Sequence, residues 1–518
     1  MENRKIQWKV NDIHGESQLQ EINLIQVDFK GTLNDVSAVI KVSPTKKMFF
    51  NGYQSWTYCP EYTVKDRIRG LVHTPAFGIK KFGLDRYADY HFVNYDNKRG
   101  HFHGFSYCYF RNEKKYQLFA SLDEYPGYTI FYYDSRKGEL KLVRDCAGVK
   151  NSGSFDAFNF CYLEGTEKQV FDRWFELLNI KQRTGKELFG YSSWYNRYED
   201  ININSIEEDL EGCKKLLQKG DLFQIDDGWE PTVGDWLEPD PVKFPDGMKS
   251  ISDKIHACGF KSGLWLAPFV ATARSKIYQE HQDWFLKVNG DNWSDGSNWG
   301  GFYSLDLDNK SVRKYIEKTF DRVFNEWNFD LVKLDFLYAG APFGDKRKSR
   351  AAKMIDAMKW LRELCGDKLI IGCGVPIMPA FGLVDYCRIG CDVGLDWNDK
   401  LYMRIIHRER VSTKQSISNT ICRRQLNHRA WGNDPDVFFL RDENLSLTPE
   451  EKEYLFTVNA LLSGILLTSD NFSKYDEKKI ELIGKVRRLT KARVTEITDE
   501  TITYKLDDET YTINRIQY

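Results

Sequence analysis

The pattern of apolar and polar positions changes near residue 188 and divides the chain into two parts of different character. Before that point the apolar residues come in short runs that are rich in β-branched and aromatic side chains, such as 36–42, 128–133 and 139–143. Gly, Asn and Asp lie between these runs, as expected of turns. Many short strands without helical periodicity between them are typical of packed antiparallel sheets. Residues 1–182 are therefore predicted to form a large antiparallel β-sandwich.

From residue 188 onward, short apolar runs alternate with longer amphipathic stretches. The eight runs of strand length are 190–194, 222–225, 262–267, 330–334, 368–373, 384–388, 437–440 and 465–468. One of the helices between them has a clear start, because Thr448 is a good N-cap and Pro449 suits the first helical position. Gly464 is a suitable stop for that helix. Eight strand–helix units predict a (β/α)8 barrel over residues 183–490.

The last segment of the chain alternates again with the period of a strand, at 501–506 and 510–513. Residues 491–518 are therefore predicted to form a small C-terminal antiparallel cap. The fold class predicted for the whole chain is multidomain α/β, with a β-sandwich, a (β/α)8 barrel and this cap.

Composition excludes several classes of protein. The 74 Lys and Arg balance 75 Asp and Glu, so the net charge of −1 argues against a strongly basic nucleic-acid or membrane-surface protein. The chain lacks the ~18 consecutive apolar residues of a membrane span, and its polar start is not a secretory leader. The 11 Cys include no CxxC pair, so neither a disulfide framework nor a structural zinc site is indicated. We expect a cytoplasmic protein without nucleic-acid or membrane partners, whose oligomeric state is open.

Polar residues gather where the predicted barrel strands end. Asp226 and Asp227 close the second strand, Trp265 lies in the third, Lys333 and Asp335 close the fourth, Cys373 closes the fifth, and Arg388 and Asp392 follow the sixth. The carboxyl ends of barrel strands meet at one mouth, so these side chains are expected to converge there. A carboxylate at the end of an apolar strand is costly to bury unless it is paired or functional.

Two of these carboxylates suit glycoside cleavage. Lys333 and Asp335 are two residues apart on a strand and point the same way, so the ammonium is expected to keep Asp335 ionised, as a nucleophile requires. Arg388 and Asp392 flank a turn that can aim a second carboxyl group at the first. Retaining glycosidases use such a pair about 5–5.5 Å apart. The alternative for any single Asp is a loop cap or an ion pair.

The adjacent pair Asp226 and Asp227 repel each other, and the hydroxyl groups of a sugar would supply donors to both. Capping of the next helix is the other interpretation of this pair. Aromatic residues reach 14% of the chain, and Trp56, Trp194, Trp229 and Trp265 are candidates for flat walls against a sugar ring. Each of these tryptophans is equally well explained as part of a core.

At these residues the chain resembles the α-galactosidases of glycoside hydrolase family 36, in particular the compact bacterial members. The resemblance covers nearly the whole chain. It runs through NGYQSW (51–56), SWY (193–195), FQIDD (223–227), GDW (234–236), LWLAPF (264–269), KLDFL (333–337), IGCG (371–374), RIGCD (388–392) and WGNDPD (431–436). Each string is weak alone, whereas their joint order and spacing are specific.

The resemblance implies an N-terminal β-supersandwich, a catalytic barrel and a C-terminal β-domain. It also implies a retaining, exo-acting α-galactosidase in which Asp335 is the nucleophile and Asp392 the acid/base. The substrate-binding residues that it implies are Asp226 and Asp227 at the 4- and 6-hydroxyls of galactose, Lys333 between the nucleophile and the ring hydroxyls, Arg388 and Cys373 at the 2-position, and Trp56, Trp194 and Trp265 around the ring. The implied partner is a small oligosaccharide or glycoconjugate with terminal α-galactose, with no metal and no cofactor.

The sequence departs from the family in a short C-terminal part and in the segment 393–397 after Asp392. Two related activities remain open on this scaffold: an α-N-acetylgalactosaminidase and an α-galactosyl transferase of the raffinose-synthase type. A non-catalytic sugar-binding protein is a third alternative. His101 and His103 resemble an HxH metal motif, but they fall in the predicted N-terminal strands, which favours a structural role.

Overall fold

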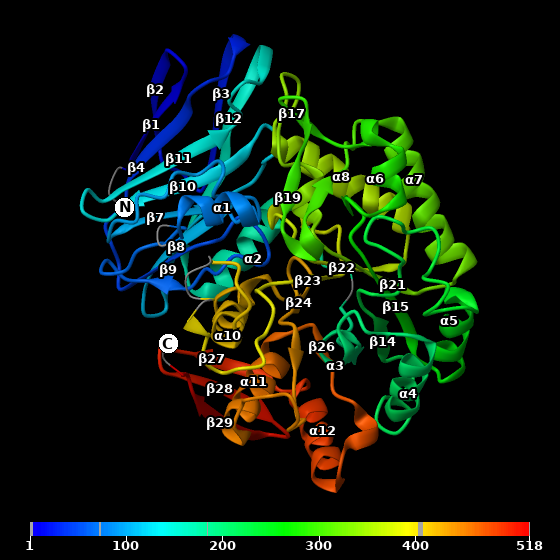
Figure 1. Cartoon of the computed structure of the whole chain (residues 1–518). Coiled ribbons are helices and arrows are strands. Elements are labelled where there is room, and N and C mark those ends of the chain that lie inside the picture. The colour runs from blue at the N-terminus through cyan, green and yellow to red at the C-terminus, as the bar shows by residue number, and fades with distance from the viewer. Residues whose placement is uncertain (1–3, 72–73, 184, 402, 404–407, 517–518) are drawn as a thin grey trace.

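The computed structural model describes residues 4–71, 74–183, 185–401, 403 and 408–516. Figure 1 shows the N-terminal strands in blue and cyan on one side of the molecule and the barrel with its helices in green to orange on the other. The C-terminal strands, in red, lie below the N-terminal strands and beside helices α11 and α12. The predicted succession of antiparallel sheets, barrel and small antiparallel cap is confirmed.

The N-terminal part consists of two six-stranded antiparallel sheets. The first has the order β2(Ile13–Gln18), β1(Lys5–Val10), β4(Val36–Lys41), β11(Glu139–Asp145), β10(Tyr128–Asp134) and β7(His101–Phe105). The second has the order β3(Ile22–Thr32), β12(Lys150–Gly165), β9(Lys115–Ser121), β8(Tyr107–Asn112), β5(Lys47–Phe50) and β6(Glu61–Tyr62). Buried side chains such as Ile40, Phe110 and Phe131 fill the space between them. Alternate residues of strands such as β3 and β11 supply this core, as the period of a strand requires.

Helix α2(Glu167–Leu178) connects the sheets to the barrel. It begins at a capping box in which Thr166 and Gln169 bond each other's backbone N–H groups. Its apolar face buries Trp174, whose indole N–H donates to the carbonyl of Ser121 at 3.0 Å. The helix is therefore anchored to strand β9 before the barrel begins.

Within the described residues the barrel contains nine short parallel strands. They are β13(Leu188–Ser192), β14(Leu222–Ile225), β15(Lys261–Leu266), β21(Leu331–Leu334), β22(Leu369–Gly372), β23(Tyr386–Arg388), β24(Gly432–Asp434), β25(Val437–Phe438) and β26(Ile465–Thr468). Each of the eight predicted strands overlaps one of these. The prediction missed β24, which is the first half of a seventh strand broken at Pro435 and Asp436.

Because of this break, residues 432–438 pair with two different neighbouring strands. Strand β24 pairs with β23, whereas β25 pairs with β26, which in turn pairs with β13. The ring of strands is therefore closed through the chain itself. Proline has no N–H to donate to a ladder, so a break at Pro435 costs the sheet little.

The main helices of the barrel part lie around the strands in Figure 1. They are α4(Ile203–Cys213), α5(Gly247–Ala257), α7(Lys310–Asp321), α8(Arg350–Cys365), α10(Thr413–Cys422), α11(Pro449–Leu462) and α12(Glu477–Leu489). The predicted start of α11 is confirmed, because Thr448 and Glu451 form a capping box and Pro449 is the first helical residue. The C-terminal cap is the antiparallel sheet β27(Arg493–Ile497), β28(Thr501–Leu506) and β29(Glu509–Asn514). No described helix is both long and apolar enough to cross a membrane.

A buried arginine joins the N-terminal part to the barrel. Arg423 follows α10 and is fully buried. Its guanidinium donates to Asn51 Oδ1 at 3.0 Å, to the carbonyl of Ser55 at 2.6 Å and to that of Gln54 at 3.1 Å, all in the loop after β5. It also donates at 3.0 Å to the carbonyl of Ile389, after barrel strand β23. One side chain therefore holds an N-terminal loop against the barrel.

Replacement of Arg423 by Met is expected to lower the free energy of unfolding by about 2–5 kcal/mol, because buried acceptors lose their donor. Chemical denaturation followed by tryptophan fluorescence measures the change. Arg347→Met is the matched control, because the Arg347 side chain is 82% exposed. A loss for Arg423→Met no larger than that of the control would contradict the role assigned to this contact.

Candidate active site

A pocket of about 430 Å³ lies at the carboxyl ends of the barrel strands. Nine of the ten predicted site residues line it: Trp56, Trp194, Asp226, Asp227, Trp265, Lys333, Asp335, Arg388 and Asp392. The tenth, Cys373, is not among its lining residues. A volume of this size is in the range of pockets for small molecules.

Asp335 directly follows β21 and lies deep in the pocket, with 8% of its surface exposed. Its Oδ2 accepts a hydrogen bond from the indole N–H of Trp265 at 3.1 Å, and its Oδ1 accepts from the backbone N–H of Phe336 at 2.9 Å. Phe336 has a φ of 53°, a left-handed conformation that is rare for a bulky residue. The backbone is therefore strained at the point where it turns a donor toward the carboxylate.

The expected pairing of Lys333 with Asp335 is only partly correct. The Lys333 ammonium bonds Asp226 Oδ2 at 3.0 Å. Burial raises the pKa of Asp335, and the charge of Lys333 opposes this rise without cancelling it. Burial lowers the pKa of Lys333, but the charges of Asp226 and Asp335 outweigh burial and raise it. Lys333 is therefore a permanent cation between two carboxylates, and it contacts Asp226 directly.

Cys373 lies behind the wall of the pocket and is 1% exposed. Its Sγ accepts a hydrogen bond from the indole N–H of Trp56 at 3.2 Å, and the thiol also hydrogen-bonds Asp335. Burial raises the pKa of this thiol well above its usual range, so it stays protonated and can donate. Cys373 thus supports Trp56 and Asp335, whereas the sequence interpretation had it facing the 2-substituent of a sugar.

The adjacent carboxylates of Asp226 and Asp227 have different partners. Asp226 Oδ2 accepts from Gln224 Nε2 at 2.7 Å and from Ser192 Oγ at 3.2 Å, in addition to Lys333. Asp227 Oδ2 accepts from the indole N–H of Trp299 at 2.9 Å. Neither residue caps the next helix, since Asp246 is the N-cap of α5. Helix capping therefore does not explain the pair.

Burial raises the pKa of Asp227 well above its ordinary value, and the neighbouring carboxyl group of Glu230 adds to the rise. The pKa of Glu230 is raised too, again chiefly by burial. Like charges in a dry site cannot both ionise easily, so this pair holds a proton.

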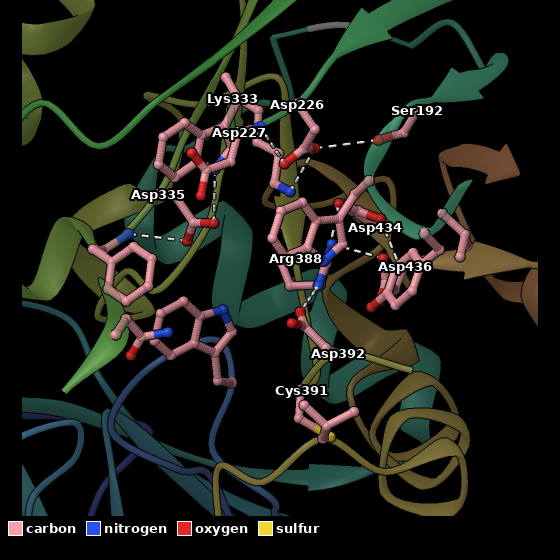
Figure 2. A pocket seen from close by; sticks show the side chains of 18 of the residues that line it. Ser192, Asp226, Asp227, Lys333, Asp335, Arg388, Cys391, Asp392, Asp434 and Asp436 are labelled. Atoms are coloured by element: carbon pink, nitrogen blue, oxygen red, sulfur yellow. Dashed lines mark hydrogen bonds and ion pairs between the residues drawn. The ribbon is translucent and has the colours of Figure 1, made fainter. Parts of the chain in front are cut away.

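Arg388, at the end of β23, is a buried cation shared by three carboxylates. Its guanidinium bonds Asp392 Oδ1 at 2.8 Å, Asp436 Oδ1 at 2.8 Å and Asp434 Oδ2 at 3.3 Å. Burial lowers the pKa of Arg388, but the carboxylates outweigh burial and raise it well above its usual range. Figure 2 shows Arg388 surrounded by these three residues.

Asp335 and Asp392 border the same cavity, and Figure 2 shows both among the side chains that line it. The Asp392 side chain is 42% exposed, whereas Asp335 lies deeper. Repulsion from Asp392 is also among the causes that raise the pKa of Asp335. Asp392 is therefore close enough to affect the ionisation of Asp335.

Comparison with known proteins shows what the chain is similar to. The family model described as Melibiase matches residues 183–357. α-Galactosidase 1 of Pediococcus pentosaceus is 30% identical over 151 residues, which span 28% of this chain and 20% of that protein. The structure of TtGalA, an α-galactosidase from Thermus thermophilus in complex with p-nitrophenyl α-D-galactopyranoside, matches with a TM-score of 0.78 and 25% identity over 96% of both chains.

The chain resembles the α-galactosidases of glycoside hydrolase family 36. AgaA of Geobacillus stearothermophilus, named as a member of that family, has the same fold at a TM-score of 0.59 and 11% identity, and this chain covers 78% of it. The match to the curated relatives is much shorter, about a fifth of their length. The resemblance predicted from the sequence is thus confirmed, and the fold is shared along nearly the whole chain.

Several lining residues of this α-galactosidase-like pocket escaped the sequence interpretation. Trp299 lies between β19(Ser294–Gly296) and β20(Phe302–Ser304), in the long excursion that separates β15 from α7, and has a φ of 54°. Tyr87 comes from the N-terminal part and holds that excursion by accepting from the N–H of Ser297 at 2.8 Å. No local signal marks either residue. Asp434 and Asp436, in contrast, stand in the WGNDPD string.

Two other candidates have a structural role. Trp229 is completely buried, and its indole donates to the carbonyl of Trp265 at 2.9 Å, so it belongs to the core. His103 bonds Asp89 at 2.9 Å and His101 bonds Asp96 at 2.6 Å, on and around strand β7. In the described part of the chain, no three His, Cys, Asp or Glu side chains are grouped so as to hold a metal ion.

Replacement of Asp227 by Asn is expected to stabilise the fold at neutral pH by about 0.5–2 kcal/mol. The ordinary pKa of 3.8 is raised in the folded state, so stability falls as pH rises from this value through the raised one. Asn keeps an acceptor for Trp299, donates to Glu230 and does not ionise. The difference between variant and wild type, measured by denaturant unfolding from pH 4 to 8, should grow with pH.

Asp246→Asn is the control, because this exposed N-cap makes no capping hydrogen bond through its side chain. A stability difference for Asp227→Asn that stays constant across this pH range would mean that Asp227 ionises normally.

Proposed function

We propose that this chain is a retaining, exo-acting α-galactosidase that hydrolyses terminal α-linked galactose from oligosaccharides or glycoconjugates. The observation that carries the proposal is the pair Asp335 and Asp392 on one pocket of about 430 Å³, within a fold matched over 96% of an α-galactosidase solved with an aryl galactoside. The chain matches only about a fifth of its curated relatives, so the activity itself is inferred from the site.

The proposed reaction is a double displacement. The Asp335 carboxylate attacks the anomeric carbon and forms a glycosyl–enzyme ester, while protonated Asp392 donates its proton to the leaving oxygen. Water then attacks the same carbon, gives a proton to Asp392 and releases Asp335 as a carboxylate. The hydrogen bonds from Trp265 and from the N–H of Phe336 support this role, because they orient both oxygens of Asp335.

The depth of the two carboxyl groups supports exo action. Asp335 is buried at the end of a strand, whereas Asp392 is 42% exposed. A galactose ring whose anomeric carbon lies between them would be enclosed, and its leaving group would extend past Asp392 toward solvent. Only a terminal sugar fits such an arrangement.

We assign the remaining predicted residues to the ring. Asp226 and Asp227 accept from the 4- and 6-hydroxyls, and Lys333 lies beside them. Trp56, Trp194 and Trp265 form its apolar walls. Arg388 uses three of its five N–H groups for carboxylates, so donors remain for the 2-hydroxyl. Cys373 acts from behind, through Trp56 and Asp335.

The decisive experiment is a kinetic panel on p-nitrophenyl α-galactoside, the matching α-N-acetylgalactosaminide and raffinose. NMR of the first product formed distinguishes retention from inversion. α-Galactose as the first product supports the proposal, and β-galactose would contradict the retaining mechanism. Turnover of the N-acetylgalactosaminide alone would identify the other hydrolase, whereas transfer to added sucrose in preference to water would identify the transferase.

Asp335→Ala is expected to lower kcat by at least about 10³-fold, because the nucleophile is lost. Azide should restore turnover of p-nitrophenyl α-galactoside by entering the vacated space, and the product should be β-galactosyl azide. Binding of galactose, measured by calorimetry, should persist. Rescue that yields the α-azide would show that another group is the nucleophile.

The loss of activity in Asp392→Ala should depend on the leaving group of the substrate. For raffinose, whose leaving oxygen needs a proton, kcat/KM should fall about 10²–10⁴-fold. For 2,4-dinitrophenyl α-galactoside, whose leaving group departs as an anion, the loss in kcat/KM should be under about tenfold. Equal losses on both substrates would exclude Asp392 as the acid.

A further inference from the structure

The break in the seventh barrel strand places a strained carboxylate beside the predicted acid/base. Asp436 has a φ of 75°, in the left-handed region that non-glycine residues rarely adopt. The kink is held by the N–H of Asp436, which donates to Asp434 Oδ1 at 2.9 Å, and by the carbonyl of Pro435, which accepts from Ser416 Oγ at 3.1 Å. Strain of this kind persists where surrounding contacts impose it, and it is concentrated at functional sites.

The carboxylate of Asp436 is buried and makes three hydrogen bonds. Its Oδ1 accepts from Arg388 Nη2 at 2.8 Å. Its Oδ2 accepts from the hydroxyl of Tyr195 at 2.5 Å and from the backbone N–H of Val393 at 2.8 Å. Val393 is the residue after Asp392, so one carboxylate fixes both the guanidinium that bonds Asp392 and the backbone that carries it.

A general acid must hold a proton when substrate arrives, yet Arg388 bonds Asp392 at 2.8 Å. A guanidinium at this distance favours the ionised carboxylate. Here Arg388 also faces Asp434 and Asp436, so three carboxylates surround one cation. The excess of negative charge favours retention of one proton in the group. Burial raises the pKa of Asp436 to about 6, and Asp392, the most exposed of the three, is the one that faces substrate and water.

We infer that Asp436 is a positioning residue that keeps Asp392 able to carry a proton, by neutralising Arg388 and fixing the backbone of Val393. The inference rests on the proposed function, since it assigns a role in tuning the acid/base. Other ionisable groups near Asp392 and Asp436 belong to several elements: Tyr195 and Tyr198 of α3(Trp194–Arg197) and its C-cap, Cys391, Asp335 across the pocket, and Arg410 near Cys391. None of them replaces the contact between Asp436 and Arg388.

The direction of the effect follows from charge. Asp436→Asn removes one negative charge, so Arg388 attracts the Asp392 carboxylate more strongly. It also removes the repulsion between Asp436 and Asp392 that contributes to the raised pKa of Asp436. In the pH profile of kcat/KM for raffinose, the basic limb, where activity falls as pH rises, should therefore move to lower pH by roughly 0.5–1 unit.

The Asn variant is conservative, because its amide oxygen can still accept from Tyr195 and Val393 while its amide nitrogen faces Arg388. With 2,4-dinitrophenyl α-galactoside, which needs no acid, kcat/KM should change less than about threefold. Asp436→Glu, which restores the charge, should return the raffinose limb toward that of the wild type. Tyr195→Phe keeps the carboxylate and removes one hydrogen bond that lowers the pKa of Asp436, so it should move the limb less than Asp436→Asn does.

If Asp436 had a purely structural role, Asp436→Asn would lower kcat/KM equally on both substrates and leave the limb in place. That result would overturn the inference. Asp434→Asn gives a second, independent test: it removes the longer contact to Arg388 and should move the limb in the same direction by less. If Asp392→Ala shows no dependence on leaving group, the proposed acid fails and this inference fails with it. If that dependence holds and neither Asn variant moves the limb, only the role of Asp436 is refuted.

Discussion

The pocket depends on two buried cations, Lys333 and Arg388, which hold five carboxylates at the mouth of the barrel. Lys333 bonds Asp226 and faces Asp335, while Arg388 bonds Asp392, Asp434 and Asp436. Without such cations, buried carboxylates would take up protons, or the fold would not bury them together. The carboxylates outnumber the cations, and burial together with repulsion between the carboxylates raises the pKa of Asp335 and of Asp436. An enzyme that needs one ionised and one protonated acid can draw on that imbalance.

Strain in the backbone serves the same arrangement. Phe336 and Asp436 both have left-handed conformations, and each lies next to or within the carboxylate clusters. At Phe336 the strained turn aims an N–H at Asp335, and at Asp436 it aims a carboxylate at Arg388. The stability of the large barrel core compensates for this local cost. In both places the regular strand geometry ends where a carboxylate is held.

The walls of the pocket come from parts of the chain that are far apart. Arg423 fixes the loop that carries Trp56, and Tyr87 of the same N-terminal part holds the excursion that carries Trp299. The indole of Trp299 then bonds Asp227. The N-terminal sheets thus contribute directly to the pocket, in addition to packing on the barrel. This explains why the family-like strings extend outside the barrel, as NGYQSW does.

The sequence alone determined the antiparallel N-terminal part, the eight barrel strands and the convergence of Asp335, Asp392 and their neighbours, because strand period and the order of strand ends are local properties of the chain. It did not reveal that Lys333 pairs with Asp226, that Cys373 lies behind the wall, or that Trp299 reaches Asp227. Those contacts join residues separated by 72 to 317 positions. Only the tertiary structure decides them, because burial and the competition among several carboxylates for two cations depend on distances that no local pattern contains.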